Sequence, residues 1–383
     1  MKQGWEIKKI GQCFSSINNG ANIKQIKGAS GLPITRIETI SNDRFNRDRM
    51  GYANIIDYKP YSKYLLSDGD ILMSHINSMK FLGRAVVYKK RNNEVILHGM
   101  NLLRLIPIND IILSYYAVLY FRTELFKKDI GAISHQSVNQ ASFNITALKN
   151  LDIPVPPLAE QERIVEILDR EFERIDALKA NAEQNLQHAK DLFQSALKQE
   201  LQPKEGWITM KLGAFAHMKA GDFIKASDIK DEYFEGAYPC YGGNGLRGYV
   251  KEPNRNGEYC LIGRQGALCG NIHIANGVFR ATEHAVVVSP YQKMPIKLIY
   301  YLLVALNLNQ YSTGAAQPGL SVKNIADNVS ISVPPQDIWN SVALRLGVIE
   351  SNCTALEENY RKTIVLCDDM KQALLRKAFN GEL

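Results

Sequence analysis

Side chains that could recognise a nucleic acid lie in two separate blocks of this chain, residues 1–150 and residues 206–333. Arg, Lys, Asn and Gln can hydrogen-bond to base edges, and Arg and Lys also neutralise phosphates. A solvated surface loop uses the same residue types, so the residues alone leave both interpretations open. In the first block the candidates are Arg36, Arg44, Arg47, His75, Asn77, Lys80, Arg84, Gln136 and Asn139. In the second block they are Lys225, Asn244, Arg247, Arg264, Gln265 and Gln317.

Residue patterns that support catalysis or metal binding are missing from the sequence. It holds no GxxxxGKS/T phosphate loop and no Asn/Asp-Pro-Pro-aromatic motif of an amino-methyltransferase. The glycine-rich segment 241–245 contains an Asn-Gly pair, which is typical of a tight turn. No standard zinc spacing is matched by the group Cys260, Cys269, His273 and His284. We therefore expect no catalytic residue and no metal site.

Charge is distributed unevenly along the 383 residues. Residues 1–150 carry 21 Lys and Arg against 11 Asp and Glu, whereas residues 151–205 carry 7 against 12. A basic block favours binding to a polyanion, because each phosphate contact releases counterions. The apolar fraction of 45% is enough for a sizeable core and excludes general disorder.

The sequence predicts a cytoplasmic protein that does not span a membrane. No apolar run reaches the ~18 residues of a membrane helix, and the first residues lack the pattern of a signal peptide. The six cysteines are scattered and form no CxxC pair, which is typical of reduced thiols.

The chain also repeats itself. The Gly-Trp and Lys-x-Gly pattern of residues 4–11 recurs at 206–213, an offset of 202. The Pro-Pro segment 153–157 recurs at 331–335, an offset of 178. A duplicated unit explains both matches.

After each Pro-Pro pair comes a long segment with helical periodicity. The segment 158–201 would be about 66 Å long as a continuous helix, at ~1.5 Å per residue. Such a helix must bury its apolar stripe against a partner, and we expect the two helices to pair antiparallel. In the first helix the predicted seam is Ile164, Leu168, Ile175, Leu178, Ala182, Ala189, Leu192 and Ala196. In the second it is Val342, Leu346, Cys353, Leu356, Tyr360, Cys367, Met370 and Leu374, at an offset of 178 throughout.

The two blocks that precede these helices have the alternation of mixed α/β domains. Strands are predicted at 83–88, 94–97 and 285–288, and short helices at 112–128 and 296–309. The predicted fold class is α+β. It consists of two globular mixed α/β domains separated by two long helices, which form an antiparallel intramolecular coiled coil with a pseudo-twofold repeat.

Several segments resemble specificity (S) subunits of type I restriction-modification enzymes. Residues 151–165 (LDIPVPPLAEQERIV) look like the signature that opens the central conserved helix of that family. Residues 374–383 resemble its usual ending. The second copy departs from the signature, because Gln-Asp-Ile-Trp at 336–339 replaces Leu-Ala-Glu-Gln. Further similar segments are 66–72, 238–245, 261–267 and 282–285.

The resemblance implies a subunit without catalytic residues or bound cofactor that recognises a bipartite double-stranded DNA site. Two methyltransferase (M) subunits would use S-adenosylmethionine to methylate adenine N6. Restriction (R) subunits would use ATP and Mg²⁺. The implied boundaries are target-recognition domains at 1–152 and 204–332, a central conserved helical region at 153–203 and a C-terminal one at 333–383.

Two other functions remain open at this stage. The chain could be a DNA-modifying enzyme with an unrecognised active site, which binding of S-adenosylmethionine by the chain alone would favour. It could also be a coiled-coil scaffold that binds proteins. A DNA affinity that falls steeply with salt would argue against that alternative.

Overall fold

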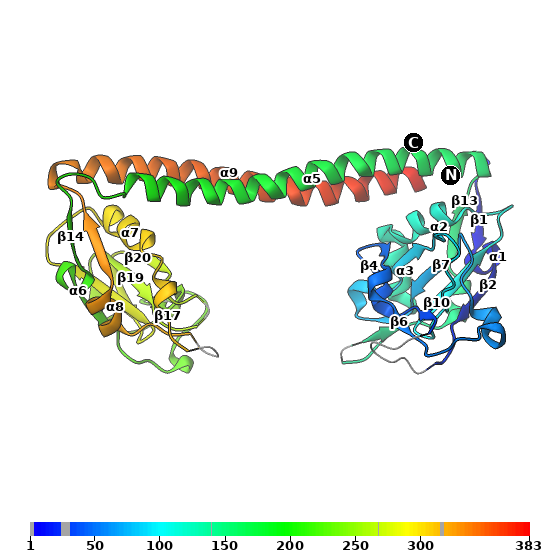
Figure 1. Ribbon diagram of the computed structural model, residues 1–383, viewed down its shortest axis with the longest axis horizontal. Helices are drawn as coiled ribbons and strands as arrows, with labels where there is room; N and C mark the ends of the chain where they lie inside the picture. The colour runs from blue at the N-terminus through cyan, green and yellow to red at the C-terminus, as the bar shows by residue number, and fades with distance from the viewer. Residues whose placement is uncertain (1–3, 24–30, 139, 267, 315–317) are drawn as a thin grey trace. The chain divides into compact units, whose positions relative to one another are not determined.

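The computed structural model divides the chain into two compact units, residues 1–181 with 363–383 and residues 182–362. Each unit combines a globular α/β part with portions of two long helices, α5 (Leu158–Glu200) and α9 (Trp339–Phe379) (Figure 1). The structure describes residues 4–23, 31–138, 140–266, 268–314 and 318–383.

The first unit is built on a four-stranded antiparallel sheet. Its third strand, β7 (Ile71–Ser74), begins with three apolar residues, and both of its faces are covered: Ile71 and Met73 enter one core and Leu72 another. A separate ribbon pairs β1 (Glu6–Lys9) with β13 (Asp152–Val155). The sheet, in order, is β2 (Phe14–Asn19), β10 (Leu102–Pro107), β7 (Ile71–Ser74) and β9 (Ala85–Val87).

The second unit repeats this plan. Its ribbon pairs β14 (Ile208–Lys211) with β23 (Ser330–Val333). Glu6 lies opposite Val155 in the first ribbon and Ile208 opposite Val333 in the second, so the two ribbons share one register. The predicted internal repeat is therefore confirmed in the backbone pairing. The main sheet, in order, is β15 (Ala216–Ala220), β22 (Ala285–Pro290), β19 (Tyr259–Gly263) and β20 (Ile272–Ala275).

Smaller sheets complete each unit. In the first unit the pairs are β3 (Pro33–Ile34) with β6 (Gly51–Tyr52) and β4 (Ile40–Ser41) with β5 (Arg44–Phe45), and a three-stranded sheet contains β11 (His135–Gln136), β12 (Ala141–Ser142) and β8 (Ile76–Asn77). In the second unit the order is β17 (Gly245–Val250), β16 (Tyr238–Gly242), β21 (Val278–Ala281) and β18 (Arg255–Asn256).

The short helices differ from the predicted ones at their ends. The single helix predicted at 112–128 is wrong, because Thr123 accepts a hydrogen bond from the Phe126 amide (3.2 Å) and starts a new helix. The helix predicted at 296–309 ends at Ala305, and Asn307 is left-handed (φ 44°). The α-helices are α1 (Ile10–Cys13), α2 (Ser114–Phe121), α3 (Glu124–Ile133), α4 (Ile145–Lys149), α6 (Leu212–Phe215), α7 (Ile296–Ala305) and α8 (Val322–Asn328). The 3-10 helices are Ile37–Thr39, Arg47–Arg49, Lys59–Tyr64, Met79–Phe81, Ala226–Asp228, Leu308–Tyr311 and Gln336–Ile338.

One predicted strand is also wrong. The described residues 94–97 form no regular strand, and Leu97 makes only isolated bridges with Ile34 and Leu65. Its side chain is fully buried, so the apolar run reflects burial in a loop rather than pairing in a sheet. The strands predicted at 83–88 and 285–288 are present as β9 and β22.

Aromatic residues fix the long helices to the globular parts. In the first unit Phe379 of α9 packs on Tyr116 and Tyr120, with ring centroids 5.2 and 5.3 Å apart. In the second unit the Tyr301 hydroxyl donates to Glu350 of α9 (2.7 Å). Each end of α9 is thus bound to a different globular core.

The two long helices run antiparallel, as predicted. In the first unit Lys371 pairs with Asp176 (2.5 Å) and Lys179 with Asp368 (2.7 Å). In the second unit Arg345 pairs with Glu200 (2.9 Å). Along these pairs the residue number on α5 rises while that on α9 falls, which is the pattern of antiparallel helices. No helix in the described part of the chain is long and apolar enough to cross a membrane.

The predicted seam is correct at only some of its positions. Buried residues recur every seven along the middle of each helix, where two facing helices can cover only one stripe. Leu178, Leu192, Leu356 and Met370 were expected in the seam but are 40–55% exposed. The buried seam positions are Ile164, Leu168, Ile175, Ala182 and Ala189 on α5 and Val342, Leu346, Cys353 and Cys367 on α9.

Candidate nucleic-acid interface

His75 and Arg264 occupy the same place in the two units. His75 directly follows β7 and Arg264 directly follows β19, each the third strand of the main sheet. The His75 side chain is buried, which lowers its pKa, and its Nδ1 has no hydrogen-bond partner among the described residues. The Arg264 Nε is also buried without such a partner. Buried polar groups are normally paired, so both strand ends have unused hydrogen-bonding capacity.

In the first unit the three-stranded sheet brings further candidates to this strand end. Gln136 lies opposite Ala141, which lies opposite Asn77 on the neighbouring strand. The Asn77 amide donates to Ser74 (3.2 Å), and the Gln136 side chain is exposed. His75, Asn77 and Gln136 therefore form one polar group, although burial of the imidazole leaves His75 poorly placed for direct base contact. The candidate Asn139 lies outside the described residues.

Lys80 and Arg84 both lie close to one aromatic ring. The Lys80 ammonium is 5.6 Å and the Arg84 guanidinium 4.5 Å from the centre of the Phe81 ring. Arg84 also forms an ion pair with Asp43 (3.3 Å). The exposed Lys80 remains available to a phosphate, whereas Arg84 is partly neutralised.

Arg47, which was predicted as a DNA contact, is engaged by other groups of the first unit. Its guanidinium donates to Glu94 (2.9 Å) and to the Lys89 carbonyl (2.8 Å), and it lies 5.1 Å from the Phe45 ring. Hydrogen bonds to Glu94, above all from Arg47, lower the pKa of that carboxyl to about 2. Arg47 therefore joins two loops and has little capacity left for a ligand.

The other two arginines of this segment are not gathered at the strand end. Arg36 forms an ion pair with Glu38 (3.4 Å), and Arg44 on β5 is exposed. Arg44, Arg47 and Arg84 line a groove of about 1200 Å³ within the first unit. Its lining also includes Asp169, Glu173, Asp176 and Asp368 of the long helices. The lining as a whole carries seven basic and six acidic side chains, and Lys179 and Lys371 pair with Asp368 and Asp176, so the opposite charges of the groove largely balance.

In the second unit the β16–β17 turn collects several candidates. Asn244 accepts a hydrogen bond from Asn271 (3.1 Å), and the Arg264 amide donates to the His284 carbonyl (3.0 Å). A side chain at Gly243 would approach the backbone carbonyls of both His284 and Gln265. Asn244, Arg264 and Gln265 are thus brought together, whereas Gln317 lies outside the described residues.

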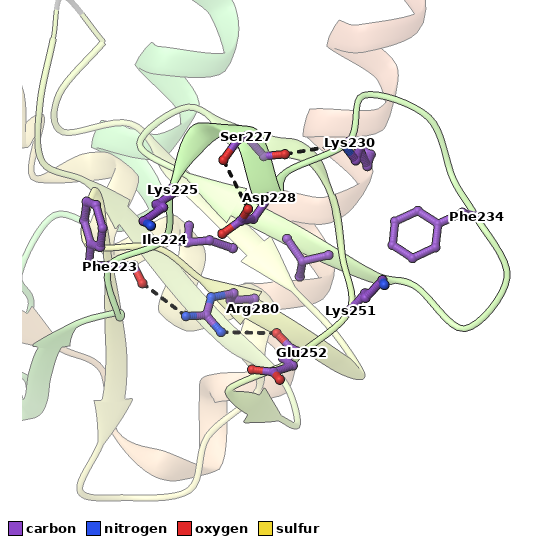
Figure 2. Close-up of a pocket in the computed structure, with 11 residues that line it drawn as sticks. Phe223, Ile224, Lys225, Ser227, Asp228, Lys230, Phe234, Lys251, Glu252 and Arg280 are labelled. Carbon is purple, nitrogen blue, oxygen red and sulfur yellow. Dashed lines mark hydrogen bonds between the residues drawn. The ribbon is translucent and has the colours of Figure 1, made fainter.

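Arg247 and Lys225 lie apart from this group. The exposed Arg247 extends over Gly242 on the neighbouring strand. Lys225 lines a separate hollow with Lys230, Lys251 and Arg280 (Figure 2). The second-block candidates therefore divide between the turn and this hollow.

The structure adds three residues that the sequence analysis did not select for DNA binding. Buried atoms without a hydrogen-bond partner in the described chain include His273 Nε2, Glu283 Oε2 and His284 Nδ1. His273 lies under the β16–β17 turn, where its ring would be 3.1 Å from a side chain at Gly245. Glu283 and His284 pair with each other (3.2 Å) in the β21–β22 turn. Apart from His75, the predicted contacts are all Arg, Asn, Gln or Lys, although a carboxylate can accept from cytosine N4.

Comparison with known proteins agrees with this architecture. A family model described as the type I restriction modification DNA specificity domain matches residues 2–188 and 204–365. The candidate MjaX specificity subunit of a type I restriction enzyme from Methanocaldococcus jannaschii is 30% identical, covering 100% of this chain and 94% of that protein. The EcoprrI specificity subunit from Escherichia coli is 44% identical over 187 residues, covering 46% of this chain and 45% of that protein.

Solved structures share the fold. A chain from a type I restriction-modification system, solved to explain complex assembly and conformational transition, superposes with a TM-score of 0.82 at 17% identity, covering 100% of this chain and 99% of that chain. The HsdS subunit from Thermoanaerobacter tengcongensis gives 0.62 at 17% identity, covering 100% of this chain and 98% of that chain. The family match covers both structural repeats and most of each long helix, and the chain therefore belongs to the type I restriction-modification DNA specificity family, as a specificity subunit.

Proposed function

We propose that this chain recognises a bipartite DNA site, with one half-site for each globular part. Residues 1–152 and 204–332 act as the two target-recognition domains. The helical regions 153–203 and 333–383 act as a ruler that fixes the spacer between half-sites. The proposed base-contacting groups are the strand-end clusters around Asn77 with Gln136 and around Asn244 with Arg264.

One observation carries this proposal. The main sheets of the two units have the same strand order, and their ribbons have the same register. The unused polar groups lie after the third strand in both. A duplicated scaffold with polar groups at the equivalent edge suits two separate half-sites, because each copy presents one recognition surface.

The proposed partners supply the chemistry. Two methyltransferase subunits, bound to the long helices, would methylate adenine N6 with S-adenosylmethionine, and restriction subunits would cleave with ATP and Mg²⁺. The exposed Leu178, Leu192, Leu356 and Met370 provide apolar area on those helices for a protein partner. We place this complex in the cytoplasm and assign no cofactor to the chain itself.

A genome-wide map of N6-methyladenine in the host, with and without the gene, tests the proposal. We expect one bipartite motif with a constant spacer to lose its methylation in the deletion strain. Complementation with the intact gene should restore that motif and no other. Restoration of methylation at a continuous, single-part motif would contradict the division into two half-sites.

A further inference from the structure

The second unit contains an open hollow apart from the turn at Asn244. It has a volume of about 820 Å³, within the range of roughly 300–1,000 Å³ typical of ligand sites. We call it the Arg280 pocket. Its walls come from the segment 223–234, from the end of β17 with the two residues after it, and from β21. Its lining residues are Phe223, Ile224, Lys225, Ser227, Asp228, Lys230, Phe234, Val250, Lys251, Glu252 and Arg280.

Arg280 holds the walls of this pocket together. Its two terminal nitrogens donate to the carbonyl of Glu252 (3.3 Å) and to that of Phe223 (3.2 Å), as Figure 2 shows. Its Nε is buried and has no hydrogen-bond partner among the described residues. Among these residues no carboxylate forms an ion pair with Arg280, so its positive charge is not neutralised.

The pocket as a whole carries excess positive charge. Lys225, Lys230 and Lys251 join Arg280, against only two carboxylates, Asp228 and Glu252. Asp228 already accepts a hydrogen bond from Ser227 (3.1 Å). Lys225 and Lys251 are exposed and form no ion pair within the described chain. This arrangement favours an anion.

Aromatic rings accompany the lysines. Figure 2 draws Phe223 beside Lys225 on one side of the pocket and Phe234 near Lys251 on the other, with Arg280 between them. Phe223 is 70% exposed. Cations next to an exposed ring match a ligand that has both a phosphate and a flat apolar group, because a base can stack on the ring while its phosphate meets the ammonium.

We propose that the Arg280 pocket binds a nucleotide unit, with its phosphate at the lysines and its base or sugar against Phe223. The source that the proposed function favours is the DNA strand next to the half-site bound by the second unit. The same chemistry would also fit a free nucleotide. As a phosphate site it anchors DNA without selecting its sequence.

The first arm of the test uses duplex DNA and the complex of the full chain with its methyltransferase partners. The variant is Lys225→Gln with Lys251→Gln. We expect the affinity for duplex DNA to fall about tenfold at moderate salt. The loss should be equal for DNA that contains the recognised motif and for DNA that lacks it. The slope of log K against log salt should fall by about 1.8, since each phosphate contact contributes ~0.9. The methylated motif itself should not change.

Two controls separate charge from folding. Lys204→Gln with Lys293→Gln removes the same charge from exposed sites of this unit outside the pocket and should leave the slope unchanged. Lys225→Arg with Lys251→Arg keeps the charge and should restore binding. Phe223→Ala should lower the affinity severalfold without altering the slope.

The second arm measures binding of adenosine 5′-monophosphate to the same complex without DNA, by calorimetry. Saturable binding that the Lys225→Gln, Lys251→Gln variant abolishes, with DNA affinity unaltered, would identify a free nucleotide as the ligand. If neither DNA nor the mononucleotide responds to the variant, the proposal is wrong. Failure of the proposed bipartite function would appear separately, as the absence of a bipartite motif in the methylation map. In that case the calorimetric measurement still shows whether the Arg280 pocket binds a nucleotide.

Discussion

Two different side chains make the same hydrogen bond at the start of the two long helices. Gln161 donates from Nε2 to the Pro156 carbonyl (2.8 Å), and Trp339 donates from Nε1 to the Pro334 carbonyl (2.8 Å). Both residues are buried and stand 178 positions apart. At Trp339 the sequence departs from the family signature. In the structure, however, the Trp339 indole N–H takes the place of the Gln161 amide as the hydrogen-bond donor. Each bond satisfies a carbonyl that would otherwise be buried without a partner.

A first prediction concerns Arg264. Arg264→Ala should weaken methylation of the motif at the half-site bound by the second unit, because a bidentate arginine contact is worth ~1–3 kcal/mol of base discrimination. Assembly with the methyltransferase subunits should be intact. Methylation by the reconstituted complex on substrates with single-base changes measures the effect. Lys293→Ala, an exposed residue outside the turn, is the control. Unchanged methylation would remove Arg264 from the interface.

A second prediction concerns Glu94, which accepts from Arg47, from the Tyr88 hydroxyl (3.0 Å) and from the Arg91 amide (2.7 Å). Its folded pKa of about 2 lies below the unfolded value of ~4.3, so the carboxylate stabilises the fold above that value and loses this effect as pH falls toward 2. Glu94→Gln should lower the free energy of unfolding by about 1–2 kcal/mol at pH 7, allowing for solvent screening.

Urea titrations at pH 7 and pH 3 measure this effect. The difference between wild type and Glu94→Gln should shrink at pH 3. Glu38→Gln, which removes the more exposed partner of Arg36, should change stability by no more than about 0.5 kcal/mol. A Glu94 effect of the same size at both pH values would exclude the ion pair as its origin.

At the scale of elements, equivalent positions of the two long helices, 178 residues apart, have similar burial. Ile175 and Cys353 are 5% and 3% exposed, whereas Leu178 and Leu356, one turn later, are 47% and 40% exposed. A single partner helix covers one stripe, so the second heptad position faces outward. Heptad spacing predicted the helices and their pairing but could not show that Leu178, Leu192, Leu356 and Met370 would remain exposed.

The third prediction compares two leucines on α5. Leu168→Ala should destabilise the first unit by about 2–5 kcal/mol, since this side chain is fully buried. Leu178→Ala should cost less than about 1 kcal/mol in the isolated chain, because the side chain is 47% exposed. Thermal unfolding of both variants checks this. Equal losses would show that Leu178 is buried in solution, by a second copy or by a different helix register.

At the scale of the whole molecule, the chain is two copies of one plan, and α5 and α9 each contribute to both copies. Neither helix can be lengthened alone without breaking the ion pairs between Lys179 and Asp368 or between Arg345 and Glu200. Under the proposed function, this pairing is what makes the spacer a fixed length.

The fourth prediction follows from that pairing. Insertion of one heptad after Ala182 and another before Tyr360 keeps the buried stripe in phase and adds about 10 Å, at ~1.5 Å per residue. We expect the spacer of the methylated motif to lengthen by about 3 base pairs, at ~3.4 Å each, or the site to be lost. Mapping of N6-methyladenine distinguishes these outcomes. An unchanged spacer would disprove the ruler.

Local pattern was enough to predict the repeat, the two long helices and the mixed α/β class. Helical period, Pro-Pro punctuation and matching offsets are properties of neighbouring residues, so they can be read without a fold. The antiparallel pairing followed as well, because a long helix with one apolar stripe needs a partner. Local pattern also misled at 112–128, where the Thr123 hydroxyl starts a second helix within the segment predicted as one.

The functional surface depended on tertiary structure. Arg36, Arg44 and Arg47 look alike in sequence, yet Glu94 engages Arg47, whereas Arg44 is exposed and shares a groove with residues of the long helices. His273, Glu283 and His284 are brought beside Asn244 and Arg264 by strands that are distant in the chain. Whether a charged side chain is free or neutralised is decided by residues far away in sequence. For that reason the sequence alone determined the scaffold of this protein, and only the fold decided which polar groups remain for a ligand.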